Sequence, residues 1–300
     1  TGRLSRSSMQ RTIHALRVCQ LKLKQHGVTR MRLVATEACR RAANAREFIR
    51  QVKREAGLQL EIIEPEEEAR LAVISCAPLV SIKTEQLLVV DIGGGSTELV
   101  WIDLSSVPKR ERPRAIMRLH AGFHPAESPF AAAKVVDWIS VPLGVATLRD
   151  QFNDVEDDSA RYALMSWFFE ENLAEFAPYR DEQPRDGFQI IGTSGTVTTV
   201  AASHLGLKRY DRTKVDGLRM TSDQIDRVIN SYLALGPAGR QLDPRIGSDR
   251  QALIMSGSAI LQALLRCWPT ERLSVADRGL REGLLYAQMS RDGVLEDAPL

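Results

Sequence analysis

The stretch that most constrains this chain is residues 87–101, LLVVDIGGGSTELVW, in which two apolar runs flank a glycine-rich turn. Leu87–Val90 is continuously apolar and rich in valine and leucine, the pattern of a strand buried on both faces. A second apolar run covers Leu99–Ile102, and three consecutive glycines lie between the runs. Glycine admits positive φ and lets another group approach the backbone closely. The stretch therefore predicts a hairpin of two strands joined by a tight turn.

The same turn combines amides, hydroxyls and carboxylates, which together suit a phosphate and a metal ion. Asp91 precedes the turn and Glu98 follows it. Successive amides form an anion cradle, and carboxylates beside a bound phosphate need a cation between them, most simply Mg²⁺. The residues expected to contact phosphate are Gly93, Gly94, Gly95, Ser96 and Thr97. The alternative is a hairpin without a ligand, and the two flanking carboxylates favour the functional interpretation.

A second stretch repeats the arrangement of a strand followed by a small-residue turn. Phe188–Ile191 predicts a buried strand, and the sequence GTSGT at 192–196 then opens a helix that runs to about Leu205. Backbone amides at a helix N-terminus bind anions well, and hydroxyls add donors. The residues expected to contact phosphate are Thr193, Ser194, Gly195 and Thr196. A plain helix cap is the alternative.

Two charged residues in the first part of the chain are candidates for chemistry. Glu68 is a candidate general base, because hydrolysis of a phosphoanhydride needs a group that orients or deprotonates water. Its acidic neighbours are expected to raise its pKa. The alternative is that Glu68 belongs to a solvated acidic first turn of a helix and has no catalytic role. Arg40 follows a predicted strand, where clefts form in α/β sheets, and arginine suits bidentate contact with phosphate. A surface arginine is the alternative for Arg40.

The rest of the chain alternates short strands with helices, which indicates a mixed α/β protein. Arg114–His120 and Asp137–Val141 predict further strands, and Thr221–Leu235 predicts a helix. The segments without a regular pattern are expected to be a loop at 121–135, a glycine- and proline-rich loop at 236–248 and a loose tail at 291–300.

Composition and charge narrow the class of protein. The 300 residues suggest about two domains, and 44% hydrophobic with 26% charged residues is ordinary for a globular protein. The four cysteines contain no CxxC pair, which favours reduced thiols in a cytoplasmic protein and disfavours a zinc site. Residues 1–54 hold fourteen Lys/Arg against Glu37 and Glu47, so they carry about +12. Such a segment suits a polyanionic partner, and a solvated helix surface would show the same charge.

Five motifs, taken in order, resemble one known family. They are VATEACRRAANAREF (34–48), IIEPEEEARLA (62–72), DIGGGSTELV (91–100), GTSGTVTTVAA (192–202) and DRGLREGLLY (277–286). This set is similar to the exopolyphosphatase/guanosine pentaphosphate phosphatase family, whose fold belongs to the actin, sugar-kinase and 70-kDa heat-shock ATPase group. The resemblance implies a two-domain actin-like, ribonuclease H-like α/β fold with an interdomain cleft. The expected domains are residues 1–84 and residues 85–300, the second carrying the DIGGGSTE hairpin.

The resemblance also implies an activity and roles for the candidate residues. The expected reaction is Mg²⁺- or Mn²⁺-dependent hydrolysis that releases terminal phosphate from polyphosphate, or converts pppGpp to ppGpp in the stringent response. Glu68 resembles the catalytic glutamate, Glu98 a second catalytic residue and metal ligand, and Asp91 a metal ligand. Arg40 resembles a phosphate-binding arginine, and the two turns resemble phosphate-contacting loops.

Two departures from the family pattern and several alternatives accompany this interpretation. Family members open with a strand and a first phosphate loop, and long members end in an HD-like helical domain. Neither is found in residues 1–300, so an N-terminal segment is expected to be missing and the short, two-domain type is indicated. The main alternative is a polyphosphate or (p)ppGpp sensor with little or no catalysis, followed by an actin-like ATPase or kinase. No membrane or nucleic-acid partner is expected, and a homodimer is left open.

Overall fold

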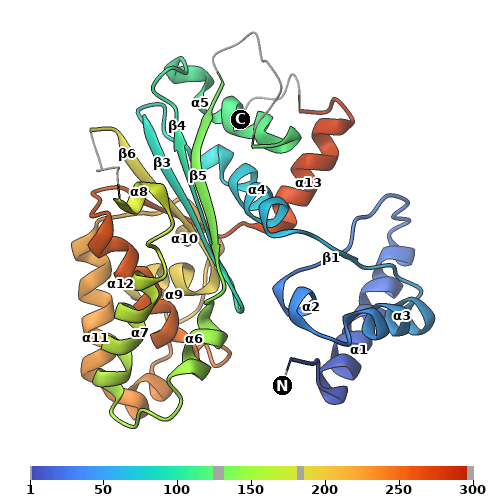
Figure 1. Ribbon diagram of the computed structural model, residues 1–300, viewed down its shortest axis with the longest axis horizontal. Helices are drawn as coiled ribbons and strands as arrows, with labels where there is room; N and C mark the ends of the chain where they lie inside the picture. Colours follow the sequence, from blue (N-terminus) through green and yellow to red (C-terminus); the bar gives the residue numbers. More distant parts are fainter. Residues whose placement is uncertain (1, 124–131, 181–185, 296–300) are drawn as a thin grey trace. The chain divides into compact units, whose positions relative to one another are not determined.

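The computed structural model describes residues 2–123, 132–180 and 186–295 (Figure 1). The chain divides into two compact units, Thr1–Glu68 and Ala69–Leu300, and the division falls inside helix α4 (Pro65–Ser75). None of the helices in these residues has the length and apolar character that crossing a membrane requires. Most of the loop expected at 121–135 and half of the tail expected at 291–300 lie outside the described residues.

The first unit contains three helices and a pair of very short parallel strands. Ser5 caps the first helix, because its hydroxyl accepts a hydrogen bond from the Ser8 amide at 3.1 Å. Gly57 ends the third helix in the left-handed region, at φ 65°. A small apolar core joins helices one and three through residues such as Ile13, Phe48 and Val52. The elements are α1 (Arg6–Gln25), β1 (Val34–Ala35), α2 (Glu37–Arg41), α3 (Ala45–Ala56) and β2 (Glu61–Ile62).

The second unit is built on a six-stranded mixed sheet with the order β5-β4-β3-β6-β8-β7. Strands β3, β6 and β8 are parallel to one another, while β4, β5 and β7 run antiparallel to their neighbours. The two parallel junctions bring the carboxyl ends of β3 and β6 to the same edge of the sheet, where α/β proteins bind ligands. The strands are β3 (Gln86–Ile92), β4 (Thr97–Asp103), β5 (Lys134–Val141), β6 (Phe188–Thr193), β7 (Arg219–Met220) and β8 (Leu273–Ala276).

The predicted hairpin is confirmed. Strands β3 and β4 pair in antiparallel register from Gln86 opposite Asp103 to Ile92 opposite Thr97. Leu87–Val90 is at most 2% exposed, as expected of a strand covered on both faces. Trp101 of β4 is fully buried, and its ring stacks on Phe188 of β6 with the ring centroids 5.1 Å apart. The hairpin is therefore held in the middle of the core, which fixes the position of its turn.

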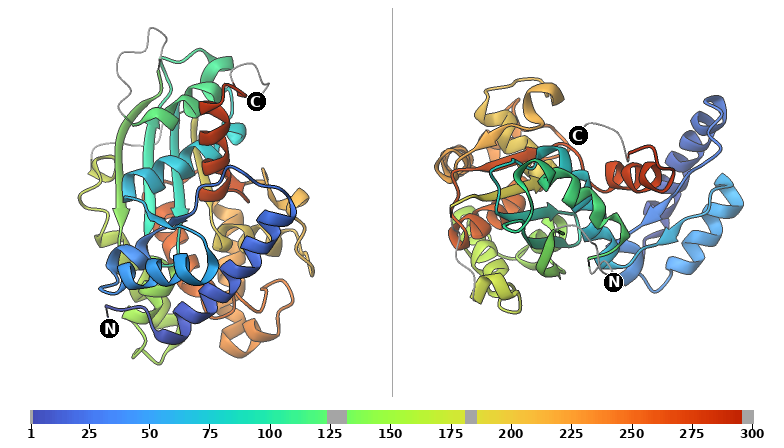
Figure 2. Two further views of the ribbon diagram at one scale, coloured as in Figure 1. Left: turned by 90° about the vertical axis from the view of Figure 1, so that its right-hand side faces the viewer. Right: turned by 90° about the horizontal axis from the view of Figure 1, so that it is seen from above.

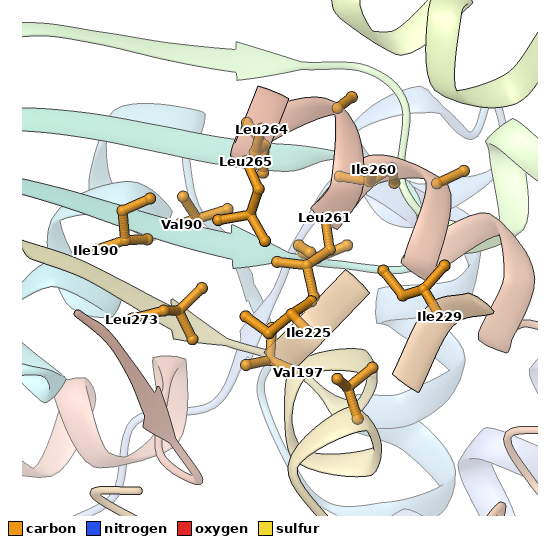
Figure 3. Close-up of a cluster of buried hydrophobic side chains, with 14 of the residues drawn as sticks. Val90, Ile190, Val197, Ile225, Ile229, Ile260, Leu261, Leu264, Leu265 and Leu273 are labelled. Carbon is orange, nitrogen blue, oxygen red and sulfur yellow. The ribbon is translucent and has the colours of Figure 1, made fainter. Parts of the chain in front are cut away.

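Helices cover both faces of this sheet, as two views agree (Figures 1 and 2). On one face, an apolar layer packs side chains of β3, β6 and β8 against the helices α9, α11 and α12 (Figure 3). On the other face, Gly283 of α13 lies so close to α4 that a Cβ would come 2.1 Å from the Leu71 carbonyl oxygen. The helices on the first face are α6 (Val145–Gln151), α7 (Asp158–Glu171), α9 (Gly195–His204), α11 (Ser222–Leu242) and α12 (Ile254–Cys267). Those on the second face are α4, α5 (Arg112–Arg118) and α13 (Leu280–Arg291). Shorter elements are η1 (Ala77–Leu79), η2 (Lys109–Glu111), η3 (Leu119–Ala121), α8 (Ala177–Arg180) and α10 (Arg212–Val215).

Two expected elements are wrong. The strand expected at Arg114–His120 is helix α5, followed by a 3₁₀ turn. Pro113 lies in its first turn, where proline favours helix, and the alanine, methionine and arginine that follow are good helix formers. The loop expected at 236–248 instead begins with seven more residues of α11, after a kink at Gly236 with φ 62°. That glycine supplies the kink, and Pro237 then starts a new helical segment.

Candidate functional site

Two strands place the predicted carboxylates side by side on one face of the sheet. Asp91 of β3 lies opposite Glu98 of β4 and, on its other side, opposite Thr193 of β6. Ser140 of β5 lies opposite Glu98 and donates a 2.8 Å hydrogen bond to Glu98 Oε1. Directly opposed residues point to the same face with Cβ atoms about 4.5–5.5 Å apart. We call Ser140, Glu98, Asp91 and Thr193 the carboxylate row.

The glycine turn is built by close backbone approach and not by positive φ. None of Gly93, Gly94 and Gly95 has positive φ, so the conformational reason expected from the sequence is wrong. The turn closes through a hydrogen bond from the Gly93 amide to the Ser96 carbonyl at 2.9 Å. The amides of Val145 and Ala146, at the start of α6, donate to the Gly93 and Gly94 carbonyls, each at 2.9 Å. The turn's carbonyls therefore face α6.

The backbone amides of this turn take no part in its contact with α6. No hydrogen bond from the amides of Gly94, Gly95 or Ser96 occurs within the described part of the chain. The Thr97 hydroxyl, by contrast, already donates to the Leu143 carbonyl at 2.8 Å. The backbone amides and the Ser96 hydroxyl are therefore the groups of this turn that remain for an anion, as in other amide cradles.

Gly144 permits the contact between the turn and α6, and this gives a testable prediction. A Cβ on Gly144 would lie 2.4 Å from the Gly93 carbonyl oxygen, which belongs to rigid backbone. We expect Gly144→Ala to lower the free energy of unfolding by about 1–3 kcal/mol through overpacking. Denaturant unfolding followed by circular dichroism measures the change.

Gly94→Ala is the matched control, because a Cβ there meets nothing within 4 Å. Its free energy of unfolding is expected to stay within about 0.5 kcal/mol of the wild type. Equal losses in the two variants would refute the packing role of Gly144.

The second predicted turn connects β6 to α9 as expected, but most of its hydroxyls serve the fold. Ser194 caps α9 by accepting a hydrogen bond from the Val197 amide at 3.0 Å. The Thr193 hydroxyl donates to the Arg278 carbonyl. The Thr196 side chain packs against Gly257 of α12, where a Cβ would lie 2.0 Å from Thr196 Oγ1. Any contact of this turn with an anion would therefore rely chiefly on amides.

A cavity of about 690 Å³ adjoins the second turn and contains one carboxylate of the row. Asp91 and Thr193–Gly195 form part of its wall, whereas Glu98 and the glycine turn do not. Its remaining wall comes from the ends of α9, the segment before α12 and the start of α13, and it is rich in arginine. The cationic members are Lys208, Arg245, Arg250, Arg278 and Arg281. The acidic members are Asp91, Asp249, Asp277 and Glu282, so the wall holds five cations and four carboxylates. The cavity has the size of a small-molecule site.

In the first unit, the structure brings Arg40 and Glu68 into contact. Arg40 Nη1 lies 2.8 Å from Glu68 Oε2 and also 2.8 Å from the Ile63 carbonyl oxygen, to which it donates. The Arg40 guanidinium further contacts Glu37 at 3.1 Å. Both Arg40 and Glu68 have side chains only 12% exposed, so neither the surface arginine nor the solvated acidic turn describes them. Arg40 therefore acts on Glu68 directly.

The pKa of Glu68 is raised, and burial is the main cause. Arg40 opposes the shift, since a nearby cation favours the carboxylate form. The acidic neighbours expected to raise the pKa are not the main cause: Glu67 is paired with Arg32 at 2.8 Å, and Glu37 contributes only weakly. Glu68 Oε2 is buried and lies against the Arg40 guanidinium, at 2.8 Å from Nη1. A buried carboxyl with a raised pKa is suited to general base chemistry.

The row offers a sparse set of donors for a metal ion. No cluster of three or more histidine, cysteine, aspartate or glutamate side chains suited to a metal occurs in the parts of the chain that the structure covers. Mg²⁺, however, is commonly held by one or two carboxylates together with water and substrate phosphates. Asp91 and Glu98 fit that pattern. Sequence reasoning missed Ser140, Gly144 and Arg250, because each acts through a partner more than forty positions away.

Comparison of the chain with known proteins identifies its family. The model of the Ppx/GppA phosphatase family matches residues 1–292. A protein of Aeromonas salmonicida named guanosine-5'-triphosphate,3'-diphosphate pyrophosphatase is 27% identical over 290 residues, which are 97% of this chain and 51% of that protein. The chain therefore spans about half the length of the curated relatives it matches.

Solved structures agree with the family match. The Aquifex aeolicus member of the Ppx/GppA family is 31% identical, with a TM-score of 0.72 over 97% of this chain and 84% of that one. An exopolyphosphatase from Cytophaga hutchinsonii, at 22% identity, has the same fold, with a TM-score of 0.78 over 98% of this chain and 85% of that one. The predicted actin-like ATPase type of fold is thereby confirmed. The chain belongs to the Ppx/GppA phosphatase family.

Proposed function

We propose that this chain hydrolyses the terminal phosphoanhydride bond of inorganic polyphosphate and also converts pppGpp to ppGpp. The observation that carries the proposal is the carboxylate row, with Asp91 opposed to both Glu98 and Thr193 at the carboxyl ends of β3 and β6. The neighbouring cavity is rich in arginine, and family membership supports phosphatase chemistry. Positioning and charge neutralisation dominate catalysis of phosphoryl transfer, and this site is arranged for both.

Glu68 is the proposed general base. Its carboxylate would accept a proton from the water that attacks the terminal phosphorus, while the leaving phosphate chain departs in line. Burial raises the pKa of Glu68 toward the range in which a carboxylate takes up a proton effectively, and Arg40 keeps enough of the charged form. Arg40 thus has two proposed roles: it binds phosphate, and it lowers the pKa of Glu68.

Asp91 and Glu98 are the residues that would hold Mg²⁺ or Mn²⁺. When bound, the metal ion supplies neutralisation of the phosphate charge. Ser140 orients Glu98 by donating a hydrogen bond to Oε1. The turns at 93–97 and 193–196 would contact phosphate, chiefly through backbone amides, because the hydroxyls of Thr97 and Thr193 donate to carbonyls of the fold.

The proposed tuning of Glu68 by Arg40 predicts a change in pH dependence. Activity needs the carboxylate form, so it is lost as pH falls through the pKa of Glu68. Arg40 lowers that pKa, and we therefore expect Arg40→Met to move the acid limb of kcat/KM to higher pH. Arg41→Met is the control, because the Arg41 side chain is 60% exposed and its one ion pair with the described residues is a long one, 3.8 Å to Glu37. An acid limb that stays in place in Arg40→Met would exclude the tuning role.

Phosphate release tests the proposed function directly. The purified protein with Mg²⁺ is expected to release phosphate from polyphosphate and from pppGpp, and removal of divalent cations with EDTA is expected to abolish release. Tight binding of both compounds without turnover would support a sensor instead. Transfer of phosphate from ATP to an acceptor would support a kinase and refute the hydrolase.

A further inference from the structure

All three carbonyls of the glycine turn accept hydrogen bonds from the first turn of α6. The Gly93 and Gly94 carbonyls accept from backbone amides of that helix, each at 2.9 Å. The Gly95 carbonyl has no backbone donor within the described residues. Its donor is a side chain, the hydroxyl of Thr147, whose oxygen lies 3.2 Å away. The third peptide group of the turn therefore depends on a side chain, whereas the first two are held by backbone.

The bonds to these carbonyls also set the direction of the amides that follow them. The peptide bonds of the turn are trans, and in a trans peptide group the N–H points opposite to the C=O. Each peptide group whose carbonyl is bound to α6 therefore directs its N–H away from that helix. The three amides concerned belong to Gly94, Gly95 and Ser96, and none of them has an acceptor in the part of the chain that the structure covers. The first turn of α6 thus aligns three amides for an anion on the opposite side.

The amide that Thr147 controls belongs to Ser96, because the Gly95 carbonyl and the Ser96 N–H share one peptide group. Ser96 is only 3% exposed. A buried amide that the protein does not satisfy is costly unless it meets water or a ligand. Glycine at position 95 restricts rotation of this peptide group less than any other residue would. The bond from Thr147 therefore decides where the Ser96 amide points.

The surroundings of the Thr147 hydroxyl direct its single proton to the turn. Its oxygen accepts a hydrogen bond from the Gly144 amide at 2.8 Å, which anchors it at the start of α6. The carbonyl oxygens of Gly144 and Gly95 each lie 3.2 Å from it. The Gly144 carbonyl already accepts from the Leu148 amide at 2.9 Å, whereas the Gly95 carbonyl has no such amide donor among residues 2–123, 132–180 and 186–295. Donation to Gly95 therefore satisfies one more backbone group.

We propose that Thr147 is a positioning residue for phosphate binding, because its hydroxyl holds the peptide group between Gly95 and Ser96 so that the Ser96 amide faces the anion. The inference rests on the proposed function, in which the turn at 93–97 contacts phosphate. Thr147 lies on the carbonyl side of the turn and acts through it. Amides that are aligned before the anion arrives need no reorganisation when it binds, which makes each of them more effective.

Nuclear magnetic resonance of nitrogen-15 glycine and serine amides tests this orientation without turnover. The parent protein carries Glu68→Gln, and tripolyphosphate is added in Mg²⁺. The amide signals of Gly94 and Ser96 are expected to shift when the anion binds. Adding Thr147→Val removes the hydroxyl at nearly unchanged shape, so the shift of Ser96 is expected to be largely lost while that of Gly94 persists.

The comparison of two amides in one molecule separates positioning from a loss of stability. Valine at position 147 also leaves the Gly144 amide without the hydroxyl oxygen that accepts its hydrogen bond, which weakens the start of α6. A general loosening of that helix would reduce the responses of Gly94 and Ser96 alike. A loss confined to Ser96 is the signature of the proposed role.

Phosphate release provides a second readout. Thr147→Val is expected to lower kcat/KM about tenfold, less than the roughly 10²–10³-fold typical of deleting such a donor, because the peptide group still visits the productive orientation. Thr147→Ser keeps the hydroxyl, and its kcat/KM is expected to stay within about threefold of the wild type. Thr12→Val is the matched control, because the Thr12 hydroxyl donates within its own helix, to the Ser8 carbonyl at 3.0 Å. Its kcat/KM is expected to be unchanged.

An equal shift of the Ser96 amide in the parent and in the variant with Thr147→Val would overturn the proposal. So would a Thr147→Ser variant as impaired as Thr147→Val. If Thr147→Val does not fold, the parent decides the matter: a Ser96 amide that does not respond to tripolyphosphate overturns the proposal, and one that responds equally with Thr147→Ser supports it.

The two proposals fail separately. If the wild-type protein releases no phosphate but its Ser96 amide responds to tripolyphosphate through Thr147, the proposed hydrolase is refuted and the positioning role stands. If it releases phosphate and Thr147→Val keeps the full response of Ser96, the positioning role is refuted and the hydrolase stands.

Discussion

Glu68→Gln is expected to lower kcat for phosphate release about 10²–10⁴-fold, the usual contribution of a positioned general base. Glutamine keeps the size and one acceptor oxygen of the side chain but cannot take up a proton from water. Glu68 is buried, pairs with Arg40 at 2.8 Å and has a raised pKa, so the replacement removes the one group of this helix turn suited to the task. Initial rates with polyphosphate and pppGpp measure the effect.

The neighbouring glutamate provides the control. Glu66 is exposed in the same helix turn, and Glu66→Gln is expected to keep kcat within about twofold, as for surface substitutions away from a site. Circular dichroism must show that both variants fold. A folded Glu68→Gln variant with full activity would remove Glu68 from the mechanism.

Asp91→Asn is expected to lower kcat/KM about 10²–10³-fold and to raise the Mg²⁺ concentration needed for half-maximal activity. Losing one of two carboxylates halves the formal charge that faces a divalent cation, and Mg²⁺ depends strongly on hard anionic oxygens. Asp91 also lies between Glu98 and Thr193 in the carboxylate row, so its removal affects both neighbours. Electron paramagnetic resonance of free Mn²⁺ measures metal affinity independently of turnover.

Asp103 gives the matched control on the same hairpin. It lies at the other end of β4, where its carboxylate accepts from the Ser105 amide at 2.8 Å, a bond that asparagine can also form. Asp103→Asn is expected to leave both Mn²⁺ affinity and activity unchanged. Unaltered Mn²⁺ affinity in Asp91→Asn would show that the row does not hold the metal.

Much of the fold near the site could be predicted from the sequence, because its signals are local. The apolar runs at 87–90 and 99–102 each predict a strand. Their antiparallel pairing in the structure follows from the short turn between them. The start of the helix predicted at Thr221–Leu235 is also set locally, since the Thr221 hydroxyl accepts a hydrogen bond from the Gln224 amide three residues away. Helix α5 was missed because a short apolar pair, Ile116 and Met117, fits a strand or a helix equally well.

The environment of the candidate residues could not be predicted in the same way. The contact between Arg40 and Glu68 joins residues twenty-eight positions apart, and only packing of the first unit decides that both are buried. The need for glycine at position 144 depends on a backbone fifty positions earlier. Arg250 covers Gly195 from a segment without a phosphate motif. Hydrogen-bond direction is likewise a tertiary property, which is why hydroxyls expected to face phosphate instead donate to the fold.

Hydrolysis in oxygen-18 water tests the central claim most directly. If Glu68 activates water for attack on the terminal phosphorus, phosphate released from polyphosphate or pppGpp by the wild-type protein carries one solvent oxygen per turnover. The shortened chain or ppGpp carries none, and Glu68→Gln slows the labelled release about 10²–10⁴-fold. Label in the remaining chain or in ppGpp, or no release of phosphate from either compound, would contradict the account.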